Sequence, residues 1–397
     1  MAENALYVLT QAYATALIQA VRQGMRVYLP NLADGQEFEY GYNHPAFIAS
    51  LEANIFRFSA AKSLVQVQIL NQLFRESTGW HDFKSKADRL ANTFQKAWMQ
   101  TEYHTAISVG ESAAQYHRLR SQAEIFPFWK YVTVADGRVR PQHAALHGLV
   151  LPFNDPKWNS IYPPNDWNCR CRVEPLTRGD VQGINMDEQR QQAKAYTQSP
   201  EFTKSKNNGF AVNRAQLGQV FTENQLYTRK FPGMAAKGLG TLKHTNWGLP
   251  DIDKVQRTQA MPVFNEPAQN FWAQIKGTEQ VASITDYTQK PVTVSRESFD
   301  QHTTNQVKSR QYRTQYLMAM QETLLHPDEV WINNQAGNNW NNMVYIKHYT
   351  GESIAVVAEM DVYLGIRLRS WFPLVEGKKS IVNNYRRGVL VHKKSTL

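Results

Sequence analysis

Cysteine is scarce in this sequence, because only two of its 397 residues are cysteines, Cys169 and Cys171. A single residue separates them, and a disulfide between them would close a ring too small for relaxed geometry. The scarcity excludes a small scaffold held together by several disulfides. It suits a protein that is made and kept in a reducing cytoplasm.

Long hydrophobic runs are also missing. No stretch of the sequence approaches the roughly 18 to 20 uninterrupted apolar residues that a membrane-spanning helix needs. The N-terminus has no basic segment followed by an apolar run, so we expect no signal peptide. We find no internal repeat, and we expect no membrane among the partners of this protein.

Apolar and aromatic residues, in contrast, are plentiful. Hydrophobic residues make up 42 % of the chain, with 18 Phe, 18 Tyr and 10 Trp, which is enough for well-packed cores. A chain of this length predicts two or three domains.

Positive charge exceeds negative charge, and the formal net charge is +10. Part of the excess is concentrated in residues 358–397, where eight Lys or Arg face three Asp or Glu and give a net charge of +5. Such a segment is either a solvated basic surface or a face that binds nucleic acid. The sequence leaves both interpretations open.

The residue pattern changes along the chain. Helical periodicity comes first, then short β-like runs with turns, then a stretch of poor periodicity that indicates a partly ordered linker, and finally alternation again. We predict an N-terminal helical extension, a helical and loop-rich module, a linker region and a C-terminal domain, with the boundaries 1–54, 55–180, 181–263 and 264–397.

The C-terminal region predicts a small α+β domain. A strand and the start of a helix fall at residues 290–299, and a helix with Leu317, Met320 and Leu324 on one face follows. Apolar runs separated by turns then indicate an antiparallel meander. The predicted fold class of the whole chain is α+β multidomain.

The two cysteines lie close in sequence to possible metal ligands. Both thiolates of a C-x-C pair can face one ion, and zinc usually takes four nitrogen or sulfur ligands. His143 and His147 lie upstream at i, i+4 spacing, so His143, Cys169 and Cys171 with either His147 or an aspartate would complete a structural zinc site. The alternative is that the cysteines are small buried apolar side chains and His143 is a hydrogen-bonded core histidine. The two candidate aspartates are Asp155 and Asp166.

Three separated motifs carry a family resemblance. They are "AWMQTEYHTA" at 97–106, "WKYVTVADGRVRPQHAALHG" at 129–148 and "DPKWNSIYPPNDWNCRCRVEPL" at 155–176. Over about residues 55–180 the chain resembles the Mu gpF-like (MuF) phage head morphogenesis family of minor capsid proteins. It departs from the family pattern at Gln100, where the family often has an arginine before the Thr-Glu pair.

This resemblance implies a minor head protein of a phage or prophage, present in few copies inside the capsid near the portal. The implied partners are the portal protein, the major capsid protein and the packaged DNA. The implied locations are the virion and, during assembly, the cytoplasm of the host bacterium. The C-x-C pair is then the closing motif of the family.

A second resemblance covers about residues 264–397. The segments "VTVSRESFDQHTTNQ", "RTQYLMAMQETLLHPDEVW", "YIKHY" and "IAVVAEM" are similar to the barnase–EndoU–colicin E5/D–RelE (BECR) class of nucleases, in particular to its phage members. The resemblance implies a metal-independent RNase that needs no cofactor for catalysis, with RNA such as tRNA as the substrate.

Cleavage of RNA without a metal needs a base for the 2′-hydroxyl proton, an acid for the departing 5′-oxygen, and cations near phosphorus. His302 is the candidate acid or base, because histidine titrates near neutrality. Lys347, Arg369 and Ser370 lie on predicted neighbouring strands and are candidates for contacting the phosphate. The secondary candidates are Arg313, Tyr385 and Arg386.

Each of these candidates has an ordinary structural alternative. His302 also suits a polar position near a helix start, and Lys347 and Arg369 also suit a charged surface. His348 is expected on the strand face opposite Lys347. Three tryptophans are candidates for stacking on bases, with core packing as the alternative: Trp331, Trp340 and Trp371.

Three functions fit these patterns. The first is a phage head protein whose C-terminal RNase travels with the DNA into the cell as a toxin. The second is a purely structural capsid protein whose inactive nuclease fold binds nucleic acid or capsid. The third is an interbacterial toxin that uses the MuF module and is accompanied by an immunity protein.

Overall fold

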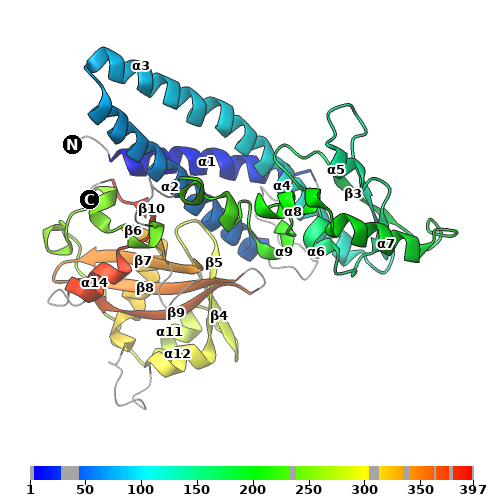
Figure 1. Ribbon diagram of the computed structural model, residues 1–397. Coiled ribbons are helices and arrows are strands. Elements are labelled where there is room, and N and C mark those ends of the chain that lie inside the picture. Colours follow the sequence, from blue (N-terminus) through cyan, green and yellow to red (C-terminus); the bar gives the residue numbers. More distant parts are fainter. Residues whose placement is uncertain are drawn as a thin grey trace. The chain divides into compact units, whose positions relative to one another are not determined.

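The computed structural model describes residues 4–27, 44–231, 238–303, 313–333, 340–361, 364–374 and 379–395. Contacts divide the chain into two compact units, each assembled from separate stretches of sequence (Figure 1). The helical unit comprises Ala12–Tyr42 and Ala61–Ala235, and the C-terminal unit comprises Met1–Gln11, Asn43–Ala60 and Ala236–Leu397. The predicted α+β multidomain class is confirmed.

Long helices form the first third of the chain, as the periodicity predicted. Among the described residues, no helix combines the length and the apolar character that crossing a membrane requires. The helical segments are α1 (Ala5–Met25), α2 (His44–Glu76), α3 (Trp80–Ala91), the π-helix η2 (Asn92–Trp98) and α4 (Met99–Ser121).

Helices α1 and α4 approach each other closely at two glycines. A Cβ atom on Gly24 would lie 2.1 Å from the carbonyl oxygen of Ile107, and one on Gly110 would lie 2.2 Å from that of Val21. Both atoms would overlap backbone, which cannot move aside without separating the helices. Glycine is therefore required at these two positions.

A small antiparallel sheet follows α4, with the strand order β2-β1-β3. Its core is aromatic, because Trp129 of β1 packs against Trp158 and Tyr162, and all three are buried. This sheet accounts for the short β-like runs of the sequence. Its elements are β1 (Phe128–Val132), α5 (Pro141–Ala144), β2 (Val150–Pro152), α6 (Trp158–Ile161) and β3 (Arg172–Leu176).

The predicted linker region begins with short helices. Asn185 caps the first of them by accepting hydrogen bonds from two backbone N–H groups, and Ser199 caps the second. Phe210 and Arg214 are buried, so this part of the predicted linker is packed. The elements are α7 (Met186–Thr197), α8 (Pro200–Asn207), α9 (Arg214–Leu217), η3 (Glu223–Gln225) and α10 (Tyr227–Lys230).

The C-terminal unit is built on a seven-stranded sheet with the order β10-β6-β7-β8-β9-β5-β4. Strands β6 to β9 form the predicted antiparallel meander, and the β5–β9 pair is the parallel one (Figure 1). The strands are β4 (Val281–Thr285), β5 (Pro291–Ser295), β6 (Glu329–Asn333), β7 (Asn342–Tyr349), β8 (Glu352–Asp361), β9 (Gly365–Leu374) and β10 (Val389–Lys393).

Short helices complete this unit. The predicted apolar face of α13 is confirmed, because Leu317, Met320 and Leu324 are fully buried. Phe299 of α12 packs against Phe271 of α11 and Trp371 of β9. The helices are η4 (Leu239–Thr241), η5 (His244–Trp247), η6 (Ile252–Lys254), α11 (Ala268–Gln274), α12 (Arg296–Thr303), η7 (Thr314–Tyr316), α13 (Leu317–Leu325) and α14 (Lys379–Tyr385).

Residues before the predicted boundary at 264 also belong to the C-terminal unit. The indole N–H of Trp247 donates to the carbonyl oxygen of Gly388 at 3.0 Å, and the backbone N–H of His244 donates to that of Arg386 at 3.0 Å. The boundary at 264 stays a prediction, but a fragment that begins there would lose these contacts.

Candidate functional site

A cleft of about 630 Å³ opens where the parallel pairing of β5 with β9 ends. The paired residues are Val292 with Ile366 and Thr293 with Arg367. Beyond them, the chain of β5 continues into α12, and side chains from β5, α12 and β9 line the space between. The polar lining side chains used below are Glu297, His302, Arg313, Arg367, Arg369 and Ser370.

His302 is the histidine of this cleft, and only 9 % of it is exposed. Its Nδ1 atom lies 2.7 Å from the carbonyl oxygen of Ser298. Because a carbonyl only accepts hydrogen bonds, Nδ1 carries a hydrogen, and Nε2 of the neutral ring is then the basic nitrogen. The imidazole also stacks on the Trp371 ring, with centroids 4.9 Å apart, so its orientation is fixed.

The hydroxyl of Ser370 connects His302 to a guanidinium group. Its Oγ lies 3.3 Å from His302 Nε2 and accepts a hydrogen bond of 2.5 Å from Arg313 Nη1. The hydroxyl hydrogen is therefore available to the basic nitrogen of His302. The guanidinium of Arg313 also lies over the ring of Phe372, 5.6 Å from its centroid.

A β-bulge in β9 explains how Arg369 and Ser370 come to line the same cleft. Leu368 pairs with Ala358 and Ser370 pairs with Val357, so Arg369 is an extra residue in the strand. The alternation of side chains is interrupted there, and Arg369 and Ser370 are both more exposed than Leu368 and Trp371 on either side. A bulge of this kind redirects side chains beside a functional site.

The cleft is rich in positive charge. Arg367 and Arg369 each place a guanidinium nitrogen 3.3 Å from Oε2 of Glu359, which neighbours them on β8. Arg313 supplies a third guanidinium group, and Glu297 is the carboxylate among the described lining residues. Such a surface suits a phosphate group.

Two of the predicted cationic residues are buried in other places. Lys347 donates from Nζ to the carbonyl oxygen of His326 at 2.8 Å and lies 3.8 Å from a carboxylate oxygen of Glu322. Arg386 is fully buried, where Nη2 and Nε donate to the two carboxylate oxygens of Glu329 at 2.6 and 3.0 Å. The structure therefore does not bring either residue to the cleft.

Tyr385 also lies outside the cleft lining. Its ring packs on Phe372 with a centroid distance of 5.0 Å, and burial raises the pKa of its hydroxyl. The structure thus places its ring against Phe372 and near Arg313.

The three candidate tryptophans differ in their burial. Trp331 and Trp371 are fully buried, and their N–H groups donate to Glu329 and to the carbonyl oxygen of Arg313. Trp340 is half-buried beneath the guanidinium of Arg57, which lies 4.7 Å from its ring centroid.

Sequence reasoning missed two charged residues of the cleft, Glu297 and Arg367. Signals for both were present. Arg367 precedes Arg369 by two positions on the same strand, and Glu297 lies in the first turn of the helix that carries His302.

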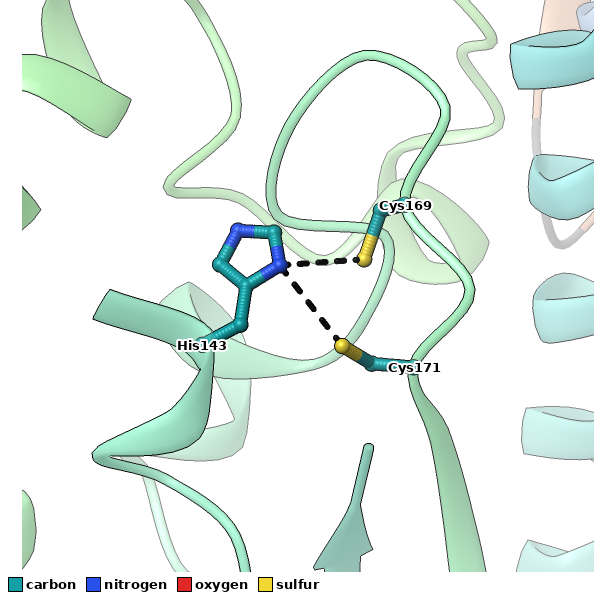
Figure 2. A group of neighbouring side chains, drawn as sticks. All are labelled: His143, Cys169 and Cys171. Atoms are coloured by element: carbon teal, nitrogen blue, oxygen red, sulfur yellow. Dashed lines mark hydrogen bonds between the residues drawn. The ribbon is translucent and has the colours of Figure 1, made fainter. Parts of the chain in front are cut away.

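A second cluster, which we name the Cys-His cluster, consists of His143, Cys169 and Cys171 in the helical unit (Figure 2). The Nδ1 atom of His143 lies 3.7 Å from the sulfur of Cys169 and 3.6 Å from that of Cys171. His143 and Cys169 are buried and Cys171 is partly exposed. The Nε2 atom of His143 is buried and has no hydrogen-bond partner among the described residues.

Polar groups surround the Cys-His cluster. The hydroxyl of Tyr131 accepts a hydrogen bond from Asn165 at 2.9 Å and neighbours Cys171; burial and the adjacent cysteines raise its pKa. Hydrogen bonding from Cys171 and the proximity of His143 lower the pKa of Cys169, whereas the pKa of Cys171 is raised by Cys169.

The predicted fourth ligands lie elsewhere. His147 is exposed, and its Nδ1 is 3.1 Å from both the backbone nitrogen and the hydroxyl of Thr133. Helix α5 ends at Ala144, so the i, i+4 spacing does not place His147 beside His143. Asp166 pairs with Arg140 at 3.3 Å.

Asp155, the other candidate aspartate, accepts a hydrogen bond from the backbone of Lys157. Like Asp166, it is not part of the cluster of ligand atoms found among the described residues.

The other residues of the N-terminal motifs hold the helical unit together. Asp136 accepts two hydrogen bonds from Arg170, at 2.7 and 2.8 Å. Glu102, of the Thr-Glu pair, is buried against the Lys62 ammonium at 2.6 Å and accepts a short hydrogen bond from Tyr227. These contacts connect the motif residues to other parts of the helical unit.

Comparisons with known proteins identify both halves. Residues 70–174 match the family described as Phage Mu protein F like protein, and residues 270–393 match the family described as phage-Barnase-EndoU-ColicinE5/D-RelE like nuclease2. The chain thus contains one segment similar to Mu F proteins and a second segment similar to BECR nucleases. Both resemblances drawn from the sequence are thereby confirmed.

Two curated relatives match the Mu F-like half. "Putative capsid assembly protein F" of Escherichia phage Mu is 39 % identical over 88 residues, which are 22 % of this chain and 20 % of that protein. "Mu-like prophage FluMu F protein" of Haemophilus influenzae is 34 % identical over 116 residues, 29 % of this chain and 28 % of that protein. The chain thus spans less than a third of either relative, and no solved structure matches it significantly.

Proposed function

We propose that this chain is a phage or prophage head morphogenesis protein whose BECR-like domain is a metal-independent endoribonuclease. The observation that carries the nuclease proposal is the connected set His302, Ser370 and Arg313 in an arginine-lined cleft. The set has an acid or base and one cation, the other arginines of the cleft add further cations, and the cleft lies in the segment that resembles a nuclease family.

The chemistry follows from these positions. His302 Nε2, or a water held by it, takes the proton of an RNA 2′-hydroxyl as the 2′-oxygen forms a bond to phosphorus. The bond from phosphorus to the 5′-oxygen breaks, and that oxygen receives a proton, for which Glu297 is the second titratable candidate. Arg313, Arg367 and Arg369 stabilise the charge on the phosphate oxygens. The products carry a 2′,3′-cyclic phosphate and a 5′-hydroxyl.

The head-assembly part of the proposal rests on the Mu F-like half. The name of the phage Mu relative describes capsid assembly, and the basic net charge of this chain suits contact with packaged DNA. The proposed partners are portal and major capsid proteins, and the proposed location is the inside of the head. The nuclease would then enter the next cell with the DNA and act there as a toxin.

The test uses the full chain, because residues 236–263 belong to the C-terminal unit. Wild type and His302→Ala are incubated with tRNA and rRNA in excess EDTA. We expect wild type to cleave, and the variant to be roughly 10²- to 10⁴-fold slower. His326→Ala is the matched control, since this exposed histidine lies outside the cleft lining and should leave cleavage unchanged.

A substrate control separates this mechanism from attack by Ser370. An oligoribonucleotide with a single 2′-deoxy position loses cleavage at that position if the 2′-oxygen is the nucleophile, and keeps it if a serine is. Absence of cleavage by the folded wild-type chain on all RNAs would overturn the nuclease proposal and favour a structural nucleic-acid-binding domain.

A particle experiment separates head assembly from toxicity. We expect the His302→Ala chain to support normal numbers of DNA-filled heads, because the substitution leaves the Mu F-like half intact. A portal gene beside this one favours the phage role, whereas an adjacent immunity gene without head genes favours the interbacterial toxin.

A further inference from the structure

The Cys-His cluster has the geometry of a metal site rather than of a hydrogen-bonded group. A single ring nitrogen has either one hydrogen or one lone pair, so His143 Nδ1 can make one good hydrogen bond. Two sulfurs nevertheless flank it at nearly equal distances of 3.6 and 3.7 Å, and Figure 2 shows both side chains directed at the same nitrogen.

These distances agree with tetrahedral zinc coordination. Zinc–sulfur bonds of about 2.3 Å and zinc–nitrogen bonds of about 2.0 Å, at tetrahedral angles, hold the sulfur and nitrogen atoms about 3.5 Å apart. All three ligand atoms of the cluster lie within 4.8 Å of one another. One ion among them can therefore reach every ligand without a rearrangement of the backbone.

The burial of the cluster also favours an ion. His143 is buried, and a positively charged imidazolium in that position would be costly. The neutral ring instead offers its Nδ1 lone pair to a cation. The guanidinium of Arg214 is a buried charge near Cys169, and it donates to the carbonyl oxygens of Gly209 and Val220.

We propose that His143, Cys169 and Cys171 bind one Zn²⁺ ion through Nδ1 and the two sulfurs, with water in the fourth position. The cluster has no fourth Cys, His, Asp or Glu ligand among the described residues, and three-ligand zinc sites hold a water there. The Tyr131 hydroxyl, placed by Asn165, donates to Cys171 and orients it. The ion would tie α5 to the loop before β3.

The test is metal analysis of the full chain after purification and reconstitution with Zn²⁺ under reducing conditions. We expect one equivalent of zinc in wild type and less than a tenth of an equivalent in Cys169→Ser, Cys171→Ser and His143→Ala. His147→Ala is the matched control. The sequence spacing suggested His147 as a zinc ligand, but in the structure it lies outside the cluster, so this variant should retain one equivalent of zinc. Loss of zinc in His147→Ala to the same degree as in His143→Ala would overturn the ligand set.

A second measurement needs no variant and covers the case in which a substituted chain fails to fold. In wild type, bound Zn²⁺ should slow alkylation of both thiols at least tenfold, and EDTA should restore it. Cobalt in place of zinc should give the intense absorption of thiolate coordination. A folded wild-type chain that takes up no metal and whose thiols react equally with and without Zn²⁺ would overturn the proposal.

Discussion

Glu329, the first residue of β6, is held at the centre of a buried polar cluster in the C-terminal unit. Its two oxygens receive hydrogen bonds from Arg386 and from the indole of Trp331, and Oε1 lies 3.1 Å from His348 Nε2. Burial by itself would raise the pKa of Glu329, but Arg386 and His348 together lower it below its usual range. The carboxylate of Glu329 is therefore charged in the folded protein. The folded state is stable only if the partners of this carboxylate offset the cost of burying its charge.

Replacing Arg386 should destabilise the C-terminal unit strongly. Arg386→Leu leaves a buried carboxylate without its main partner, for which we expect a loss of roughly 3 to 5 kcal/mol in the free energy of unfolding. Lys394→Ala, at an exposed position, should change it by less than about 0.5 kcal/mol. Urea unfolding followed by tryptophan fluorescence measures the free energy of unfolding of both variants. Equal effects of the two substitutions would contradict the stabilising role of the buried Arg386–Glu329 pair.

Glu329 also makes the free energy of unfolding depend on pH, and the direction of this dependence follows from its lowered pKa. Since folding lowers the pKa of Glu329, its contribution to stability is fully present above the unfolded value of about 4.3 and is lost as the pH falls toward the folded value. Acid titration of the unfolding free energy should therefore show a decline below about pH 4.3 that is smaller in Glu329→Gln. An identical decline in both proteins would assign the acid sensitivity to other carboxylates.

Residue patterns predicted His302, Arg313, Arg369 and Ser370, and the structure places them in one cleft. The residue patterns gave wrong positions for side chains in segments where buried and exposed residues do not alternate regularly. Residues 343–349 of β7 are all buried, so alternation does not identify an exposed face there, and Lys347 is enclosed. Arg386 pairs with a residue 57 positions away, a contact for which local sequence gives no signal.

At the scale of secondary-structure elements, the β-bulge in β9 determines which side chains of that strand line the cleft. It adds one residue, Arg369, between two buried side chains while the pairing with β8 continues on both sides. Strand alternation alone predicts Arg369 and Ser370 on opposite faces, which is why the sequence could suggest these residues but not their common orientation.

Deleting Arg369 should remove the bulge and leave a regular strand. Leu368 and Trp371 would remain on the buried face, so we expect the melting temperature to change by only a few degrees. Cleavage should fall more in this deletion than in Arg369→Ala, because alanine keeps the bulge that directs Ser370. The comparison of RNA cleavage rates checks this, and equal rates in the two variants would show that only the guanidinium matters.

At the scale of the whole molecule, the proposed zinc site and the proposed nuclease cleft lie in different compact units. Elements of the C-terminal unit come from both ends of the sequence, so the order of residues does not reveal this grouping. The predicted domain boundaries were placed where the residue pattern changes along the sequence. The compact units are instead defined by contacts between distant residues, such as that of Gln11 with Val391.

Calorimetry of the full chain should show two unfolding transitions. Zinc at about 100 times its dissociation constant should stabilise the transition of the helical unit by about 2.7 kcal/mol and leave the other in place. Arg386→Leu should lower only the transition of the C-terminal unit. A single transition that shifts under both treatments would mean that the units unfold together.

Both cysteines of the chain lie in one cluster, and this has a practical consequence. Any dye, mercurial or oxidant that is specific for sulfhydryl groups acts at this one locus, without prior removal of other cysteines. Once any bound metal is removed, a label on these thiols reports on the segment that is similar to Mu F proteins, while the C-terminal unit remains unlabelled.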